Sequence, residues 1–241
     1  MPFTFSHPAI VLPLTYLPKK WFSLTGLVIG SLIPDFEYFL RMKIKSNYSH
    51  TIEGLFWFDL PLGILLAFVF HNSVRNSLFN NLPFCLKSRL KAFTHFNWND
   101  YFKRNWYSVI ISILIGASSH LLWDSFTHDH GYFVEHLPQL QESVILFGNE
   151  VAGLKLVQHT STLIGGLVIA FAVYKLPKTK IKKEKISMNY WIISGSIIFV
   201  VLALRFMNGL EPSQYGNVIV SFISAVLISL IVTPWVVSVK V

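Results

Sequence analysis

The chain has 241 residues, of which 53% are hydrophobic and 13% charged, and its mean hydropathy is +0.52. This composition is too apolar for an ordinary soluble domain and indicates an integral membrane protein. The net charge of +8 does not indicate a nucleic-acid partner, because the basic residues gather in two inter-helix loops, as is usual where cytoplasmic loops meet anionic lipid headgroups. The single cysteine, Cys85, excludes an intramolecular disulfide.

The N-terminal stretch is apolar but interrupted. It lacks the basic start and the small-residue cleavage site of a secretory signal, so we expect it in the mature fold. Residues 8–17 are too few to cross a bilayer as a straight helix, and residues 22–40 are broken by glycines and a proline. We expect a short re-entrant or interfacial hairpin with lysines 19–20 at its turn, which would bring His7 and Asp35 to the same membrane face.

Five longer apolar segments follow, and we expect each to cross the membrane as a helix. They lie at residues 54–70, 106–126, 155–175, 189–207 and 217–238. The loops 75–104 and 176–188 are rich in Lys and Arg, which places them in the cytoplasm, whereas the loop 129–154 has acidic residues and no Lys or Arg and is expected outside. The predicted fold class is an all-α polytopic membrane helical bundle of about six hydrophobic segments.

The expected domains follow one another along the chain. They are a metal-site helical membrane domain (1–176), a basic cytoplasmic linker (177–188) and a C-terminal two-helix membrane hairpin (189–241). The C-terminal pair carries no constellation of metal-ligand residues and is interpreted as scaffold or dimer surface. Its Arg205 is expected to reach the headgroups. In the first span, Asp59 beside Pro61 is either a ligand or a helix–helix polar contact, and we favour the contact.

Three metal-competent side chains, those of His120, Asp124 and His128, follow one another at intervals of four at the end of the segment 106–126. Four residues advance an α-helix by about 6 Å with little net rotation, so the three share one face. Ionisable groups in an apolar span are costly and usually functional, which favours a metal or catalytic site. The alternative is a polar stripe satisfied by neighbouring helices.

The membrane orientation of the chain, inferred from its Lys- and Arg-rich loops, places further imidazoles and carboxylates at the outer face of the membrane. They are Asp35, His50 and His159, joined by His7 if the first segment is a hairpin. A cluster drawn from several helix ends is what a zinc site, or a site of two or three zinc ions, requires. The basic residues 41–45 would lie on the same side, where they could contact an anionic substrate or headgroup.

Four motifs are specific and together extend over most of the chain. They are Met-Pro-Phe-Thr-Phe-Ser-His-Pro-Ala at the start, Gly-Ser-Leu-Ile-Pro-Asp-Phe-Glu ending at Glu37, Ser-His-Thr around His50, and Ser-His-Leu-Leu-Trp-Asp-Ser-Phe-Thr-His ending at His128. At these motifs the chain resembles bacterial membrane proteins of the domain-of-unknown-function family 4184. That family is similar in motif order to predicted membrane-bound metal-dependent hydrolases, which have been likened to zinc phospholipases C and P1-type nucleases.

The resemblance implies that His7, Asp35, His50, His120 and Asp124 are metal ligands. Glu37 stands where those hydrolases carry a second Asp, and Thr51 stands where they carry a Ser.

From the residues and the resemblance together we expect a membrane-embedded, metal-dependent (zinc) hydrolase that acts on a phosphoester, a phospholipid among the candidates, at the outer face of a bacterial cytoplasmic membrane. One to three zinc ions are expected, and membrane lipid is the expected partner. The expected catalytic residues are Glu37, Asp35 and Asp124, with Glu37 or Asp59 as base or supporting acceptor. The expected metal ligands are His7, Asp35, His50, His120, Asp124, His128 and His159. The alternatives are a metal or proton transporter and a non-catalytic scaffold with a structural metal.

Overall fold

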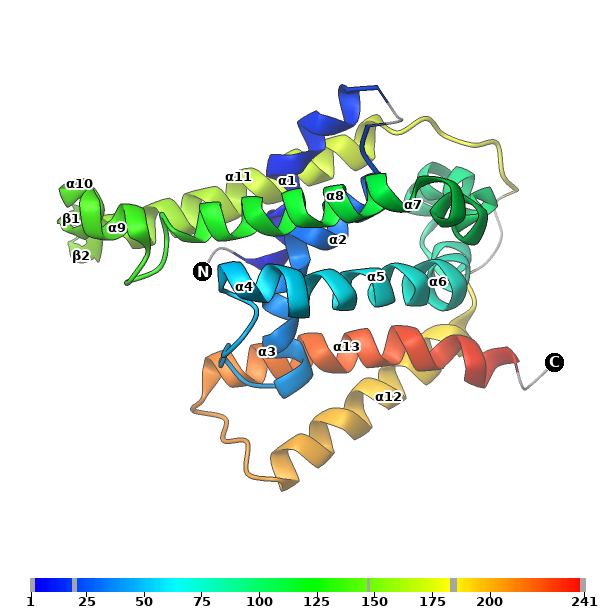
Figure 1. Cartoon of the computed structure of the whole chain (residues 1–241). Helices are drawn as coiled ribbons and strands as arrows, with labels where there is room; N and C mark the ends of the chain where they lie inside the picture. Colours follow the sequence, from blue (N-terminus) through cyan, green and yellow to red (C-terminus); the bar gives the residue numbers. More distant parts are fainter. Residues whose placement is uncertain (1–2, 19–20, 147, 183–185, 239–241) are drawn as a thin grey trace. The chain divides into compact units, whose positions relative to one another are not determined.

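The computed structural model describes residues 3–18, 21–146, 148–182 and 186–238, and these form an all-α fold (Figure 1). Helices make up 76% of the structure, and the described residues contain a single two-stranded sheet. The predicted all-α polytopic helical bundle is confirmed.

Five helices in the described part of the chain are long and apolar enough to cross a membrane, and they coincide with the five expected spans. They are Ile52–Asn81, α8 (Trp98–Asp124), α11 (Gly153–Lys175), α12 (Met188–Met207) and Tyr215–Val237 within α13 (Tyr215–Ser238). The chain is therefore a membrane protein.

The first span is one helical stretch with two wide turns. It consists of α4 (Ile52–Gly54), a π-helical turn (Leu55–Asp59), α5 (Leu60–Val69), a second π-helical turn (Phe70–Val74) and α6 (Arg75–Asn81). Thr51 caps the start, because its side chain accepts a hydrogen bond of 2.9 Å from the Gly54 N–H. Pro61 has no N–H for the preceding turn, which explains why the helix widens there.

The described residues among the first 40 fold as short helical pieces, and no candidate span lies among those described residues. The pieces are 3-10 turns (Thr4–Ser6, Leu12–Tyr16, Ile33–Asp35) and the helices α1 (Pro8–Val11), α2 (Leu24–Leu32) and α3 (Phe36–Arg41). The chain doubles back as the hairpin interpretation requires, since the Thr4 hydroxyl donates a hydrogen bond to Asp35. The lysines at 19–20, expected at the turn, lie outside the described residues.

The loops carry short elements. They are α7 (Phe84–Leu90) and a 3-10 turn (Lys91–His95) before α8, then α9 (Tyr132–His136), α10 (Pro138–Gln141), β1 (Ser143–Leu146) and β2 (Asn149–Ala152) before α11. The two strands pair antiparallel, with Val144 opposite Val151. Their β-branched residues favour strand, but the segment is only a few residues long, and the sequence was interpreted simply as an acidic loop.

The chain forms two compact units that interleave along the sequence. One contains residues 1–35, 48–64 and 105–175, and the other contains residues 36–47, 65–104 and 176–241. The sequential domains stay a prediction that rests on composition, which marks the basic loops as boundaries but does not show that α5 and α8 each continue from one unit into the other.

In the first unit, α2 and α8 cross at close range. A Cβ on Gly30 would collide with the backbone of Ile113, and a Cβ on Gly116 would lie only 2.6 Å from the Ser31 nitrogen. Leu27 and Ile113 are fully buried at the crossing. Glycine is therefore required at two positions to bring α2 against the helix that carries His120.

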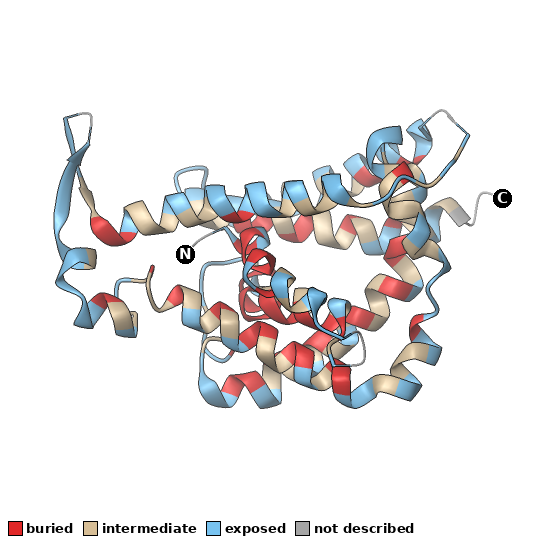
Figure 2. Cartoon of the chain, turned by 90° about the horizontal axis from the view of Figure 1, so that it is seen from above, coloured by how far each residue is buried: buried red, intermediate tan, exposed pale blue. Residues whose placement is uncertain are grey.

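The exterior of α11 is apolar. This helix, which follows the β-hairpin, is largely exposed in Figure 2. Its exposed side chains include Leu163, Ile164, Leu167, Val168 and Phe171. A helix face of this composition suits contact with lipid acyl chains, as its assignment as a membrane span requires.

In the second unit, α12 and α13 pack side by side (Figure 1). The Ser194 and Ser229 hydroxyls hydrogen-bond across the pair at 3.0 Å. Arg205, which was expected to extend to the headgroups, donates from Nη2 to the carbonyl oxygen of Met42 at 3.2 Å. The C-terminal pair therefore binds the turn that follows α3.

Candidate metal centre

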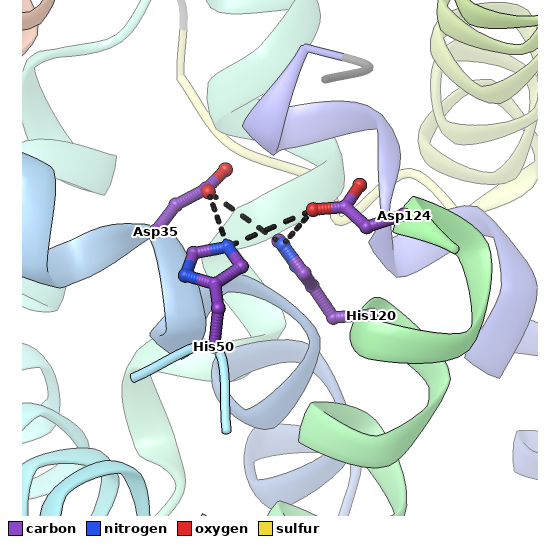
Figure 3. A group of neighbouring side chains, drawn as sticks. All are labelled: Asp35, His50, His120 and Asp124. Atoms are coloured by element: carbon purple, nitrogen blue, oxygen red, sulfur yellow. Dashed lines mark ion pairs between the residues drawn. The ribbon is translucent and has the colours of Figure 1, made fainter. Parts of the chain in front are cut away.

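Four side chains from three separate segments converge on one point (Figure 3). Asp35 ends the 3-10 turn after α2, His50 lies just before α4, and His120 and Asp124 lie one turn apart on α8. One ligand atom from each of the four lies within 4.8 Å of those of the others. This group, which we call the four-residue cluster, could hold a metal ion.

The four distances from imidazole nitrogen to carboxylate oxygen in the four-residue cluster are close to those between the ligands of a tetrahedral ion. The Nε2 atom of His50 lies 3.5 Å from Asp35 Oδ1 and 3.6 Å from Asp124 Oδ2, and the Nε2 atom of His120 lies 3.6 Å and 3.3 Å from the same two oxygens. An ion with bonds of about 2.0–2.2 Å to tetrahedral ligands separates them by roughly 3.4 Å. The side chains therefore need little rearrangement to bind one.

The His120 ring is held in the tautomer that binds metal. Its Nδ1 atom lies 2.7 Å from the carbonyl oxygen of Ser31, which can only accept, so the proton is on Nδ1. The lone pair of Nε2 then faces the two carboxylates. The close crossing of α2 and α8 places the Ser31 carbonyl, and the orientation of His120 is thus a consequence of the glycines there.

Asp35 is fully buried and divides its two oxygens between two roles. Oδ2 accepts a hydrogen bond from the Thr4 hydroxyl, and Oδ1 faces the two imidazoles. Sequence reasoning missed Thr4. Its signal was available, because Thr4 lies three positions before His7 and so lies near it on a helical turn.

His7 is fully buried beside the four-residue cluster. Its ring stacks on that of His120, with centroids 3.7 Å apart and 14° between the planes, and its Nε2 atom lies 3.6 Å from Asp124 Oδ1. Neither ring nitrogen has a hydrogen-bond partner among the described residues. Burial, with a contribution from His120, lowers the pKa of His7 to about 3, so the ring is neutral and can act as a ligand.

The N-terminal turn that carries His7 is fastened to α11. The Phe3 N–H donates to the Thr162 hydroxyl at 3.0 Å, and the Ser6 hydroxyl donates to the Thr162 carbonyl at 3.1 Å. A Cβ on Gly165 would lie 2.9 Å from Ser6, so α11 approaches this turn closely. These contacts hold the N-terminal segment, which is too short to span the membrane, beside the four-residue cluster.

The ligand atoms of the four-residue cluster are buried, but the side chains around them differ in exposure. The side chains of Asp35 and His120 are fully buried, whereas those of His50 and His128 are 20% and 34% exposed. The Nδ1 atom of His128 lies 3.0 Å from the carbonyl oxygen of Asp124, which can only accept a hydrogen bond. Nδ1 therefore carries the proton and has no lone pair to offer to the four-residue cluster. His128 therefore flanks the four-residue cluster on its less buried side.

The two buried carboxylates make the site attractive to a cation. Burial alone would lower the pKa of His50, but hydrogen bonds to Asp124 and Asp35 and the charge of Asp35 outweigh it, and the pKa of His50 is raised. Two buried anions need compensation by protons or by a bound cation. The neutral imidazole and carboxylate donors are those that zinc and other divalent first-row metals accept.

Besides His7 and His128, which flank the four-residue cluster, three further residues predicted for the site lie outside it. His159 is exposed on α11, and Asp59 is buried in the first π-helical turn. The Glu37 carboxylate accepts hydrogen bonds from residues 41–47. Ligand chemistry, membrane side and motif position selected these three, whereas their actual positions depend on which helix faces pack together.

The comparisons with known proteins identify a family and no relative. No curated protein and no solved structure matches the chain. A family model for a domain of unknown function, DUF4184, matches residues 1–235 and so includes both units and all the side chains described above. The chain therefore belongs to the DUF4184 family.

Proposed function

We propose that the chain is a membrane-embedded, metal-dependent hydrolase that binds a divalent ion, zinc in the first instance, through Asp35, His50, His120 and Asp124. The phosphoester substrate class rests on the motif resemblance to predicted membrane-bound hydrolases. The bacterial cytoplasmic membrane and its outer face are part of the same proposal.

The observation that carries the proposal is the donor set of the four-residue cluster, which has two imidazoles, two carboxylates and no thiolate. Structural zinc sites are typically built from cysteine thiolates with or without histidine, whereas histidine and carboxylate ligands are typical of catalytic zinc. The buried side, formed by Asp35 and His120, orients the ligands, and His50 and His128 form the less buried side. This donor chemistry supports a reacting site over a purely structural one.

The chain's own residues supply the remaining functions. A bound divalent ion supplies Lewis acidity and lowers the pKa of a water molecule it binds. The Ser31 carbonyl and the Thr4 hydroxyl orient one imidazole and one carboxylate. His128, which is partly exposed beside the four-residue cluster, is placed to exchange a proton with solvent or to contact the substrate.

The competing function is a scaffold in which a metal only joins helices, and it is favoured by the presence of four protein ligands, the number in closed structural zinc sites. Elemental analysis of the protein purified in mild detergent tests both ideas. About one divalent ion per chain is expected. The chelated protein should regain cleavage of phospholipids or generic phosphodiesters when zinc, manganese, cobalt or iron(II) is returned. Stoichiometric ion with no product from any substrate would establish the scaffold, and absence of any ion would overturn both.

The orientation can be tested with the native cysteine. Cys85 is exposed on α7, within the basic loop that the positive-inside rule places in the cytoplasm. A membrane-impermeant thiol reagent should therefore leave intact cells unlabelled and modify Cys85 only after lysis. As control, Cys85→Ser with Ser143→Cys, at an exposed strand position of the acidic loop, should be labelled from outside. Labelling of Cys85 in intact cells would place the four-residue cluster on the cytoplasmic side.

A further inference from the structure

The segment between Asp35 and His50 leaves one cluster residue and returns at another. Glu37 lies two positions after Asp35, and its carboxylate bonds to the returning part of the chain. Oε1 accepts from the Asn47 N–H at 2.9 Å, and Oε2 accepts from the Ser46 hydroxyl at 3.0 Å. The side chain of Glu37 is 2% exposed. A buried carboxylate thus closes the loop whose two ends carry two of the four cluster residues.

Arg41 completes the charge balance around Glu37. Its Nε and Nη2 atoms donate to Oε1 at 2.8 Å and 2.7 Å, one helical turn along α3. Glu37 therefore has an ionic partner and hydrogen bonds to both oxygens. A carboxylate with these partners is better suited to fixing the backbone than to accepting a proton from water.

The turn of the same loop is anchored to the C-terminal helix pair. Met42 has a φ of 49°, a left-handed conformation that a non-glycine residue adopts only when its surroundings enforce it. Its carbonyl oxygen accepts from the Arg205 side chain and from the Ser221 hydroxyl, each at 3.2 Å, and the Ile44 N–H donates to Asn217 Oδ1 at 2.9 Å. The loop from 36 to 47 is therefore a built structure held at both its base and its turn.

We infer that Glu37 is a positioning residue that sets where the chain returns to His50, and so determines whether His50 and Asp35 can bind the same ion. The inference rests on the proposed metal site. It assigns Glu37 a role different from the catalytic base expected from the sequence. The short connection matters, because Asn47 is three residues before His50, and a shift at Asn47 is passed along the backbone.

The decisive experiment counts imidazole ligands. Copper(II) is added to the metal-free protein in detergent, and pulsed electron paramagnetic resonance reports the number of coordinated histidine nitrogens. His50→Ala defines the spectrum with one imidazole fewer. Glu37→Ala should give that same spectrum and lose about tenfold to a hundredfold in copper affinity, the range seen when groups that orient metal ligands are removed. Glu37→Gln keeps an acceptor for the Asn47 N–H and should restore the wild-type spectrum.

Two control variants separate positioning from loss of charge or of the ion pair. Glu53→Ala removes an exposed carboxylate three residues after His50 and should leave the spectrum unchanged. Arg41→Met removes the ion pair but keeps the bonds to Ser46 and Asn47, and should also keep both imidazoles.

Amide hydrogen exchange across residues 42–50 of the metal-free protein gives a second readout that needs no ion. Exchange there should speed up in Glu37→Ala and stay at the wild-type rate in Glu37→Gln. The milder Ser46→Ala tests the same loop if Glu37→Ala does not fold, with a smaller gain in exchange expected. Wild-type exchange and an unchanged imidazole count in Glu37→Ala would overturn the inference. No bound copper in the wild type would instead contradict the proposed metal site.

Discussion

Replacing Asp124 with asparagine should abolish metal binding and turnover together. The amide keeps the shape of the side chain but removes the anion whose Oδ2 faces His50 and His120. Its NH2 group, if turned inward, would also point a donor at a cation. Loss of an orienting group alone costs about 10–100-fold in metal affinity, so loss of a ligand should cost at least about 100-fold.

The measurement is zinc affinity by titration calorimetry, with elemental analysis of the purified variant and the phosphoester assay alongside. Asp129→Asn is the matched control, because it removes the same charge from an exposed position in the same stretch of chain and should leave metal content and turnover intact. If Asp124→Asn retained a stoichiometric ion with near wild-type affinity, the four-residue cluster would not be the metal centre. If it lost metal and thermal stability while neither protein had any activity, the metal would be structural.

The second large effect is a loss of stability, expected when one methyl group is added at the crossing of α2 and α8. In Gly116→Ala the new Cβ would lie 2.6 Å from the Ser31 nitrogen and 2.8 Å from the Gly30 carbonyl carbon, both of which are backbone atoms. The two helices must separate to admit it. Overpacking of this kind costs about 1–3 kcal/mol and sometimes more, and we expect about 3 kcal/mol here because no flexible side chain can give way.

Thermal unfolding of the metal-free protein in detergent measures this effect. Gly166→Ala and Gly195→Ala are the controls, because a Cβ at either helical position meets no atom within 4 Å. Alanine there should be neutral or stabilising by up to about 1 kcal/mol. Zinc affinity should also fall in Gly116→Ala, since the Ser31 carbonyl that orients His120 moves with α2. Equal stability of Gly116→Ala and Gly166→Ala would contradict the close crossing.

The spans and half of the four-residue cluster follow from local periodicity. A membrane helix satisfies its backbone within itself, so length and apolarity alone locate it. Likewise, the interval of four between His120 and Asp124 puts them on one helix face before any tertiary structure is known. Asp35 and His50 required a further step, namely that helix ends on one side of the membrane can meet.

What periodicity cannot show is which helix faces pack together. His159 has the same ligand chemistry as His50, yet it lies on an exposed face of α11. Glu37 has the chemistry of a base, but its partners at 41–47 become visible only when the loop is folded. The interleaving of the two units escapes the sequence for the same reason, because composition changes at loops and not in the middle of α5 or α8.

The attachment of the N-terminal turn to α11 also bears on when the site can be completed during synthesis. The partner of Phe3 on α11 lies 159 residues further along the chain. At translation rates of about 5–20 residues per second, roughly 8–30 s pass between the emergence of the two segments. Until α11 has entered the membrane, His7 lacks these anchors, and α8 itself is not made until late in that interval. Loading of a metal is therefore expected after insertion of α11, the third of the five candidate spans, as a late step of biogenesis.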